Sequence, residues 1–185
     1  MPNVTRCGWA RAEPNVSYHD TEWGVPLHDD RGLFEFLVLE GAQAGLSWAT
    51  ILKKRGNYRA AFDDFDARRI ARYDARKATR LLADPGIVRN RAKITAAMAN
   101  ARAAQRLPEG LSELLWSFAP SASRPRPATL ADVPATSSES VAMAKELRRR
   151  GFVFIGPTTA YALMQATGMV DDHVSDCFRA SPGGG

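Results

Sequence analysis

Four side chains that commonly bind metals lie near the two ends of the chain. Cys7 and His19 are twelve residues apart, and His173 and Cys177 are four residues apart, a spacing that would put both on one face of a helix. Two thiolates and two imidazoles match the tetrahedral Cys2His2 set of a structural zinc site. Such a site would join the N-terminal segment to the C-terminal segment.

The spacing of these residues leaves two other interpretations open. Cys7 and Cys177 could form a disulfide, although intracellular proteins rarely keep one. They could also be unrelated buried thiols, because free cysteine often behaves as a small apolar residue. A ligand pair at each end of the chain is a weaker zinc signal than two Cys-x-x-Cys motifs. The remaining histidine, His28, lies beside two aspartates, and we expect it on the surface.

Glu40 is a carboxylate in an apolar pattern. It follows Phe36 by four residues and Leu37 by three, which places it on or beside the apolar face of a helix. A carboxylate directed at a core is costly unless it is paired, and such groups gather at functional sites. The structural alternative is that Glu40 caps a neighbouring helix or pairs with an arginine.

Aromatic residues concentrate in the same part of the chain. Within the first 48 positions stand Trp9, Tyr18, Trp23, Phe34, Phe36 and Trp48. Aromatic faces around a carboxylate suit a flat, electron-poor or cationic ligand. For any single one of these residues, ordinary core packing is the alternative.

The positive charge of the chain is confined to one segment. The whole chain carries +5, whereas residues 76–106 hold eight basic residues and one acid, Asp84, so the rest of the chain sums to −2. A local excess of this kind is typical of a surface that binds a nucleic-acid backbone. The alternative is a solvated helix face in an arginine-rich chain.

The elements that must position these residues are predicted to be helices. We expect one helix that is capped by Asp30 and closed by Gly41 and Gly45, and a second that is capped by Ser47 and runs to about Arg55. Asp66, Asp74 and a Thr136/Glu139 capping box would begin three more helices. Others are expected over residues 87–107, 111–118 and 157–167. The sequence therefore predicts an all-α fold: one domain over residues 1–180 and a tail over residues 181–185. The Pro- and Ser-rich loop 119–138 either contacts DNA through Arg124 and Arg126 or is a disordered connector.

Composition excludes several classes of protein. Apolar residues make up 45% and charged residues 24%, as in globular chains and not in disordered or collagenous ones. No segment approaches the roughly 20 apolar residues that span a bilayer, and the N-terminus lacks a signal-peptide pattern. We expect a cytoplasmic protein.

Several blocks of sequence together form a specific pattern. They read RCGW at 6–9, YHDxEWGVP at 18–26, LEGxQAGLSW at 39–48, GIxRxRxKI at 86–94, NAR at 100–102, RGFxFxG at 150–156, YxxMQA at 161–166 and DH at 172–173. In these blocks, which extend over nearly the whole chain, the sequence resembles the Tag-type 3-methyladenine DNA glycosylases. The chain departs from their pattern at residues 15–17, where it is one residue shorter and lacks a further aromatic residue often found there.

The resemblance implies a helix-hairpin-helix glycosylase fold with one structural zinc ion per chain, held by Cys7, His19, His173 and Cys177. It implies that Glu40 contacts the methylated base, with Tyr18 and Trp48 in the base pocket and Trp9 and Trp23 as its walls. Residues 77–107 would be the hairpin, whose Gly86 turn and following helix, with Arg89, Arg91 and Lys93, would hold DNA phosphates.

The implied activity is hydrolytic removal of 3-methyladenine from alkylated double-stranded DNA by a monomeric base-excision repair enzyme. We expect Leu46, on the turn that follows Gly45, to wedge into the base stack, the alternative being that it packs under Trp48. Many hairpin glycosylases carry an aspartate beyond the hairpin, but here no acid lies between Asp84 and Glu109. This favours a monofunctional enzyme for cationic bases, with Lys93 as a phosphate contact and not a lyase nucleophile. The alternatives are a non-catalytic zinc-containing DNA-binding domain of the same fold, and a relative acting on other N3-alkylated purines or a bulky adduct.

Overall fold

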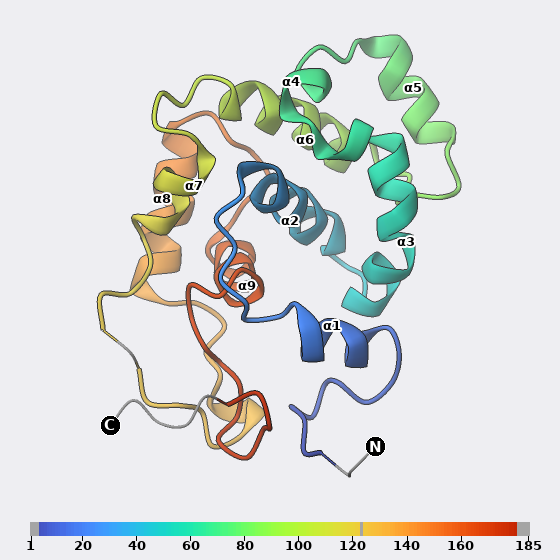
Figure 1. The fold of residues 1–185 in the computed structure, drawn as a ribbon. Coiled ribbons are helices and arrows are strands. Elements are labelled where there is room, and N and C mark those ends of the chain that lie inside the picture. The colour runs from blue at the N-terminus through green and yellow to red at the C-terminus, as the bar shows by residue number, and fades with distance from the viewer. Residues whose placement is uncertain (1–3, 123, 181–185) are drawn as a thin grey trace.

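The computed structural model describes residues 4–122 and 124–180, and within them every regular element is a helix (Figure 1). This confirms the all-α prediction; the predicted tail, 181–185, lies outside the described residues. The elements are α1 (Asn15–Thr21), α2 (Asp30–Gln43), α3 (Trp48–Ala61), η1 (Asp63–Phe65), α4 (Ala67–Ile70), α5 (Ala75–Ala83), α6 (Arg91–Ala104), α7 (Leu111–Trp116), η2 (Leu130–Asp132), α8 (Ser138–Arg149) and α9 (Pro157–Ala166). None of these helices is long and apolar enough to cross a membrane.

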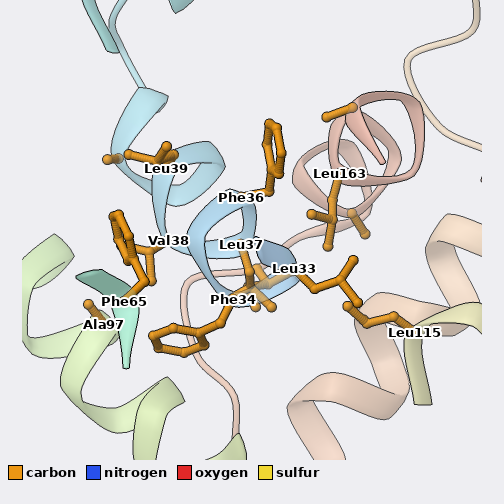
Figure 2. Packing of buried hydrophobic residues seen from close by; sticks show 14 of the residues in the cluster. Leu33, Phe34, Phe36, Leu37, Val38, Leu39, Phe65, Ala97, Leu115 and Leu163 are labelled. Carbon is orange, nitrogen blue, oxygen red and sulfur yellow. The ribbon is translucent and has the colours of Figure 1, made fainter. Parts of the chain in front are cut away.

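Helix α2 is the centre of the fold. It packs against α3, α6, α7 and α9, so side chains on nearly its whole circumference are buried (Figure 1). Figure 2 shows Leu115 and Leu163 on one side of α2 and Phe65 and Ala97 on the other. A helix that is surrounded in this way must be apolar all round, which explains the nearly continuous apolar run of its sequence.

The N-terminus of α2 is capped differently from our prediction. Asp29, and not Asp30, is the N-cap, and its carboxylate accepts a hydrogen bond from the Gly32 amide at 2.7 Å. Asp30 instead accepts from the amides of Leu111 and Ser112, at 3.1 and 2.7 Å. Asp30 therefore satisfies the free amides at the start of α7, a contact between residues about 80 positions apart that no local pattern could have indicated.

Helix α2 ends between the two glycines that were predicted to close it, whereas α3 is longer than predicted. Helix α2 continues through Gly41 to Gln43, because packing on all sides outweighs the intrinsic cost of a glycine. Gly45, with φ of +80°, follows the helix end. Ser47 caps α3 as predicted, but α3 runs to Ala61 and not to Arg55. Its second half is held by Arg55 and Arg59, which both pair with Glu35 of α2.

The starts of four further helices, α4, α5, α6 and α8, can be compared with the local signals. Asp66 and Asp74 cap α4 and α5 as predicted. Helix α6 begins at Arg91 behind an Asn90 cap, and not at residue 87, because the Val88 amide is drawn to the Tyr58 hydroxyl at 3.2 Å. The capping box of α8 is Ser137 with Ser140, one residue later than predicted.

Helices α5 and α6 form a hairpin whose turn rests on α3. Asp84 accepts from the Gly86 amide at 2.7 Å, while Lys54 donates to the Pro85 carbonyl at 2.9 Å and Asn57 donates to the Gly86 carbonyl at 3.3 Å. A Cβ atom on Gly86 would lie 2.9 Å from the Asp84 carboxylate and 3.0 Å from Asn57, so this close approach requires glycine. Two helices joined by a tight turn thus lie in the region where the resemblance implies a hairpin over residues 77–107.

The Pro- and Ser-rich loop is docked on the C-terminal part of the chain. Arg124 donates to the Tyr161 hydroxyl at 2.8 Å, and Arg126 pairs with Asp171 at 2.6 Å. The Pro127 carbonyl accepts from the Ser175 amide at 3.0 Å. In the described residues the loop is therefore held against the protein and is not a free connector, while a DNA contact through Arg124 and Arg126 stays a prediction.

Candidate functional site

A cavity of about 390 Å³ lies where α1, the end of α2, the start of α3 and α9 meet. It brings together all five residues that we predicted for the base site: Trp9, Tyr18, Trp23, Glu40 and Trp48. Seven others complete its lining: Asn15, Gln43, Leu130, Val133, Ala162, Gln165 and Asp172. The volume is in the range of pockets that enclose a small organic molecule.

Aromatic rings form much of the cavity wall. The rings of Tyr18 and Trp48 are 5.4 Å apart between centroids, and those of Trp9 and Trp23 are 5.1 Å apart with their planes nearly perpendicular. Trp9 also lies 6.2 Å from Tyr18. Faces and edges in this arrangement can stack on a flat ring, and they attract a cationic ring more strongly.

Glu40 is the cavity's unpaired carboxyl group. Its side chain is 7% exposed, and neither an arginine nor a helix amide binds it in the part of the chain that the structure describes. Burial raises its pKa from an ordinary 4.5 to about 8. Glu35, on the same helix, shows the usual alternative, because Arg55 and Arg59 pair with it. The structural roles that we considered for Glu40 are therefore absent from the described residues.

Tyr18 keeps its proton in this environment. Burial raises the pKa of its phenol well above 10, and the neighbouring negative charges of Glu40 and Glu22 act in the same direction. The hydroxyl thus remains a neutral hydrogen-bond donor beside the Glu40 carboxyl.

A second polar group at the cavity comes from α9 and the segment after it. Asp172 accepts from the Tyr161 hydroxyl at 2.5 Å and from the Gln165 amide at 2.8 Å, with Arg124 3.9 Å away. Sequence reasoning assigned no role to Gln165 or Asp172, although both lie in blocks of the family pattern. Gln43 lies in such a block too, whereas Leu130 and Val133 carry no sequence signal, since only the docking of their loop brings them to the cavity.

The four predicted metal ligands meet beside this cavity. Cys7, His19, His173 and Cys177 are all buried, and their ligand atoms lie within 4.8 Å of one another. Both cysteines are free thiols, so the disulfide alternative is wrong. The helix that we considered for His173 and Cys177 is also wrong, because residues 171–174 are irregular and lead into a turn. A hydrogen bond from the Cys177 amide to the Val174 carbonyl at 2.9 Å closes this turn.

The donor set and its spacing fit a tetrahedral metal ion. Cys177 Sγ lies 3.4 Å from His19 Nε2 and 3.6 Å from His173 Nδ1, and Cys7 Sγ lies 3.7 Å from His173 Nδ1. Tetrahedral bonds of about 2.0 Å to nitrogen and 2.3 Å to sulfur place ligand atoms roughly 3.3 to 3.8 Å apart. Burial lowers the pKa of His173 to about 4, so its imidazole is neutral, as a ligand must be.

A second layer of contacts orients the ligands. Asp20 lies 2.9 Å from His19 Nδ1, so that Nε2 is the ring nitrogen that faces the Cys177 sulfur. Hydrogen bonds from Arg6 lower the pKa of Asp20 to about 2, so that it is ionised. Gly24, with φ of +78°, passes so close to His173 that a Cβ atom there would lie 3.1 Å from Nε2.

The metal cluster and the cavity share a wall. The Trp9 ring lies 5.3 Å from the His19 ring, and the Trp23 ring lies 4.6 Å from the His173 ring, both edge to face. Tyr18 directly precedes His19 in α1. The positions of three cavity aromatics thus depend on the ligands.

The residues predicted to contact DNA differ in whether their side chains are exposed or bound within the protein. Leu46 is 40% exposed on its turn, so it is not packed away under Trp48. Arg89 and Arg91 are exposed at the start of α6. The Lys93 ammonium donates to the carbonyls of Ala42 and Ala44, at 2.7 and 2.6 Å, and so caps the C-terminus of α2.

Part of the basic segment therefore holds the fold. Like Lys93, Arg102 binds backbone carbonyls, those of Ala71 and Tyr73, at 3.0 Å each. The Gly86 amide is likewise committed to Asp84, so a phosphate at this turn would have to use the amides further along, next to Arg89 and Arg91. The exposed arginines of α5 and α6 remain as the positive surface of the hairpin.

Comparison with known proteins gives one consistent result. A family model described as methyladenine glycosylase matches residues 9–180. DNA-3-methyladenine glycosylase 1 of Escherichia coli (strain K12) is 46% identical over 179 residues, which cover 94% of this chain and 96% of that protein.

Solved structures agree with this match. A crystal structure of 3-methyladenine DNA glycosylase I superimposes with a TM-score of 0.90 at 46% identity, covering 95% of this chain and 99% of that one. A variant of a 3-methyladenine DNA glycosylase I in complex with 3-methyladenine has a TM-score of 0.88 at 33% identity, covering 93% and 95% of the two chains.

The pKa of Glu40 predicts how stability depends on pH. Between pH 4.5 and 8 the folded chain keeps the Glu40 proton and the unfolded chain loses it, so the stability contributed by this group falls as pH rises, by about 1.4 kcal/mol per pH unit. Glu40→Gln cannot ionise. We expect its free energy of unfolding, relative to wild type, to increase steadily from pH 5 to pH 8 in urea titrations.

Glu113→Gln, on an exposed position of α7, is the matched control and should show no such trend. A difference between Glu40→Gln and wild type that stays constant over this pH range would contradict the raised pKa.

Proposed function

The chain belongs to the methyladenine glycosylase family, and on that premise we propose that it is a DNA-3-methyladenine glycosylase of base-excision repair. It acts as a monomer on alkylated double-stranded DNA and hydrolyses the bond between the damaged base and the sugar. The observation that carries this proposal is the unpaired, buried carboxyl of Glu40 in an aromatic cavity.

Glu40 selects the base by charge. Methylation at N3 gives adenine in DNA a positive charge, and a cation beside a carboxyl lowers the pKa of that carboxyl. A group with a pKa of about 8 in the empty cavity therefore ionises when the cationic base enters, and it then accepts a charge-assisted hydrogen bond from the base. A neutral base provides no such gain, so it binds the cavity more weakly than the cationic base does.

The aromatic residues complete the recognition. Tyr18 and Trp48 contact the flipped base, and Trp9 and Trp23 form the outer walls that limit its size. A nucleotide must leave the base stack to reach this cavity, which costs a few kcal/mol, least for a damaged base. Stacking inside the cavity offsets that cost.

The chemical step needs little acid catalysis. The C1′–N9 bond breaks with its electron pair moving to N9, which neutralises the cationic base. A water oxygen bonds to C1′ and its proton is released to solvent. Lys93 takes no part as a nucleophile, because two backbone carbonyls hold its ammonium group. The enzyme is therefore monofunctional, with no Schiff base and no strand cleavage.

Contacts to the DNA come from two places. Leu46, on the turn after Gly45, enters the base stack as the base leaves it. The hairpin turn at Gly86, with Arg89, Arg91 and the start of α6, holds phosphates. Lys93 does not contact the phosphates in this arrangement; its hydrogen bond to the Ala42 carbonyl joins the end of α2 to α6.

Zinc is the metal that the cluster binds, with one ion per chain. A buried set of two thiolates and two imidazoles is closed to substrate, so a bound ion supplies structural cross-linking and no catalytic chemistry. Cys7, His19, His173 and Cys177 hold it, and they fix the N-terminal wall of the cavity.

Base release is the direct test of the activity. We expect the protein to release 3-methyladenine and not 7-methylguanine from N-methylated duplex DNA, measured by chromatography. Glu40→Gln should lower the single-turnover rate about 10- to 100-fold, the effect of losing one charge-assisted hydrogen bond. Glu113→Gln should release the base at the wild-type rate. A zinc-containing, DNA-binding protein that releases no 3-methyladenine would instead be a binding module or an enzyme for another lesion.

The proposed insertion of Leu46 into the base stack can be tested by substitution. We expect Leu46→Ala to slow excision from duplex DNA about tenfold, because an alanine cannot fill the space that the flipped base leaves. Binding of free 3-methyladenine should be unchanged. Val141→Ala, at a similarly exposed apolar position of α8, is the control. Unchanged excision by Leu46→Ala would remove the wedge from the mechanism.

The metal is tested by its content and by its effect on stability. We expect one zinc ion per chain by elemental analysis, and none in Cys177→Ala. Loss of the ion should lower the melting temperature by about 10 °C or more, since metal binding contributes directly to folding. His28→Ala, which removes an exposed histidine outside the cluster, should keep its zinc. Full stability without any metal would contradict the structural role.

A further inference from the structure

Asn15, the first residue of α1, brings an amide group to the cavity. Its Nδ2 donates to the Trp9 carbonyl at 3.5 Å. Its Oδ1 is buried and has no hydrogen-bond partner among the described residues. The donation to Trp9 sets the orientation of the amide, because the flipped amide would place two oxygens against each other.

A buried acceptor without a donor is unusual. Leaving one unsatisfied costs about 1 to 3 kcal/mol, and native structures contain few such groups. The Asn15 side chain does not cap α1, so the fold gives its oxygen no role. A ligand that donates a hydrogen bond in the cavity accounts for the free oxygen.

The chemistry of the substrate restricts the donor. In 3-methyladenine within DNA, N9 is bonded to the sugar, N3 carries the methyl group, and N1 and N7 have lone pairs. The two N–H bonds of the 6-amino group are therefore the conventional donors of the base. A second purine lesion, 3-methylguanine, has an oxygen at position 6, which would face the Asn15 oxygen with like partial charge.

We propose that Asn15 Oδ1 accepts a hydrogen bond from the 6-amino group of the flipped base, and so determines specificity for 6-amino over 6-oxo purines. The inference rests on the proposed function. It adds a contact that recognises the base by a hydrogen bond, and not by charge or by stacking. Glu40 selects for positive charge, which both lesions carry, whereas Asn15 distinguishes them at position 6.

At this point the wall of the cavity is the amide of Asn15, so a directional hydrogen bond is available here in place of contact with an aromatic ring. Directional contacts discriminate between similar ligands more sharply than apolar ones do.

The test combines a substitution of Asn15 with a ligand that lacks the 6-amino group. Asn15→Leu keeps the approximate size of the side chain and removes the acceptor, and 3-methylpurine is 3-methyladenine without the 6-amino group. Dissociation constants of both free bases can be measured through the fluorescence of the cavity tryptophans, Trp9, Trp23 and Trp48. A partly unfolded variant lowers the signal but leaves the ratio of the two constants unchanged.

We expect wild type to bind 3-methyladenine more tightly than 3-methylpurine, and Asn15→Leu to reduce that preference about 5- to 10-fold, the value of one hydrogen bond. Asn15→Asp, which keeps an acceptor oxygen, should retain the preference. In parallel, Asn15→Leu should lower the release of 3-methyladenine relative to 3-methylguanine from the same methylated DNA.

A change of less than twofold in the ratio of binding constants, in a protein whose wild type releases 3-methyladenine, would overturn the inference alone. It would mean that a water molecule serves the Asn15 oxygen. A wild-type protein that neither binds nor releases 3-methyladenine would overturn the proposed function, and this inference with it.

Discussion

The convergence of Cys7, His19, His173 and Cys177 is the constraint on which the candidate site depends. Outside this cluster, the N-terminal and C-terminal segments are also joined by a hydrogen bond from the Phe178 amide to the Thr5 carbonyl at 2.9 Å. The aromatic walls of the cavity lie directly against the ligands, Trp9 on His19 and Trp23 on His173. Whatever fixes the four side chains therefore also fixes the distance between the aromatic walls and the carboxyl on α2. A metal ion held by these four side chains would in this way set the dimensions of the cavity without contacting a ligand in it.

The central helix shows how one fold accommodates two buried carboxyl groups for different purposes. Glu35 pairs with Arg55 and Arg59 of α3, so its charge is compensated and it binds two helices together. Glu40, a turn and a half further on, has no such partner and faces the cavity, and burial raises its pKa to about 8. Keeping Glu40 unpaired is costly for folding. In the function that we propose, the same cost makes the site selective for a positively charged ligand.

Some basic side chains of residues 76–106 stabilise the fold, and others are exposed on the surface. Lys93 and Arg102 bind backbone carbonyls, which ties the hairpin to the end of α2 and to the turn after α4. Arg89 and Arg91 are exposed at the start of α6. A count of charges over residues 76–106 therefore overstates the number of cations that can meet a phosphate. The cations that hold the hairpin in place also determine where the exposed ones point.

Local sequence was sufficient for the helical class of the fold and for the caps at Ser47, Asp66 and Asp74, and it singled out four side chains that could bind a metal. These features rest on short-range hydrogen bonds, or on residue types rare enough to mark a site. The resemblance to a family, and not local sequence, pointed to the five cavity residues. Tertiary structure alone decided that Asp30 caps α7, that α3 runs past Arg55, and that His173 and Cys177 meet through a turn and not along a helix. It also brought Asn15, Leu130 and Val133 to the cavity. The physical reason is the same in each case: the partner that satisfies the group lies far away in the chain, so its contribution is invisible until packing brings the two together.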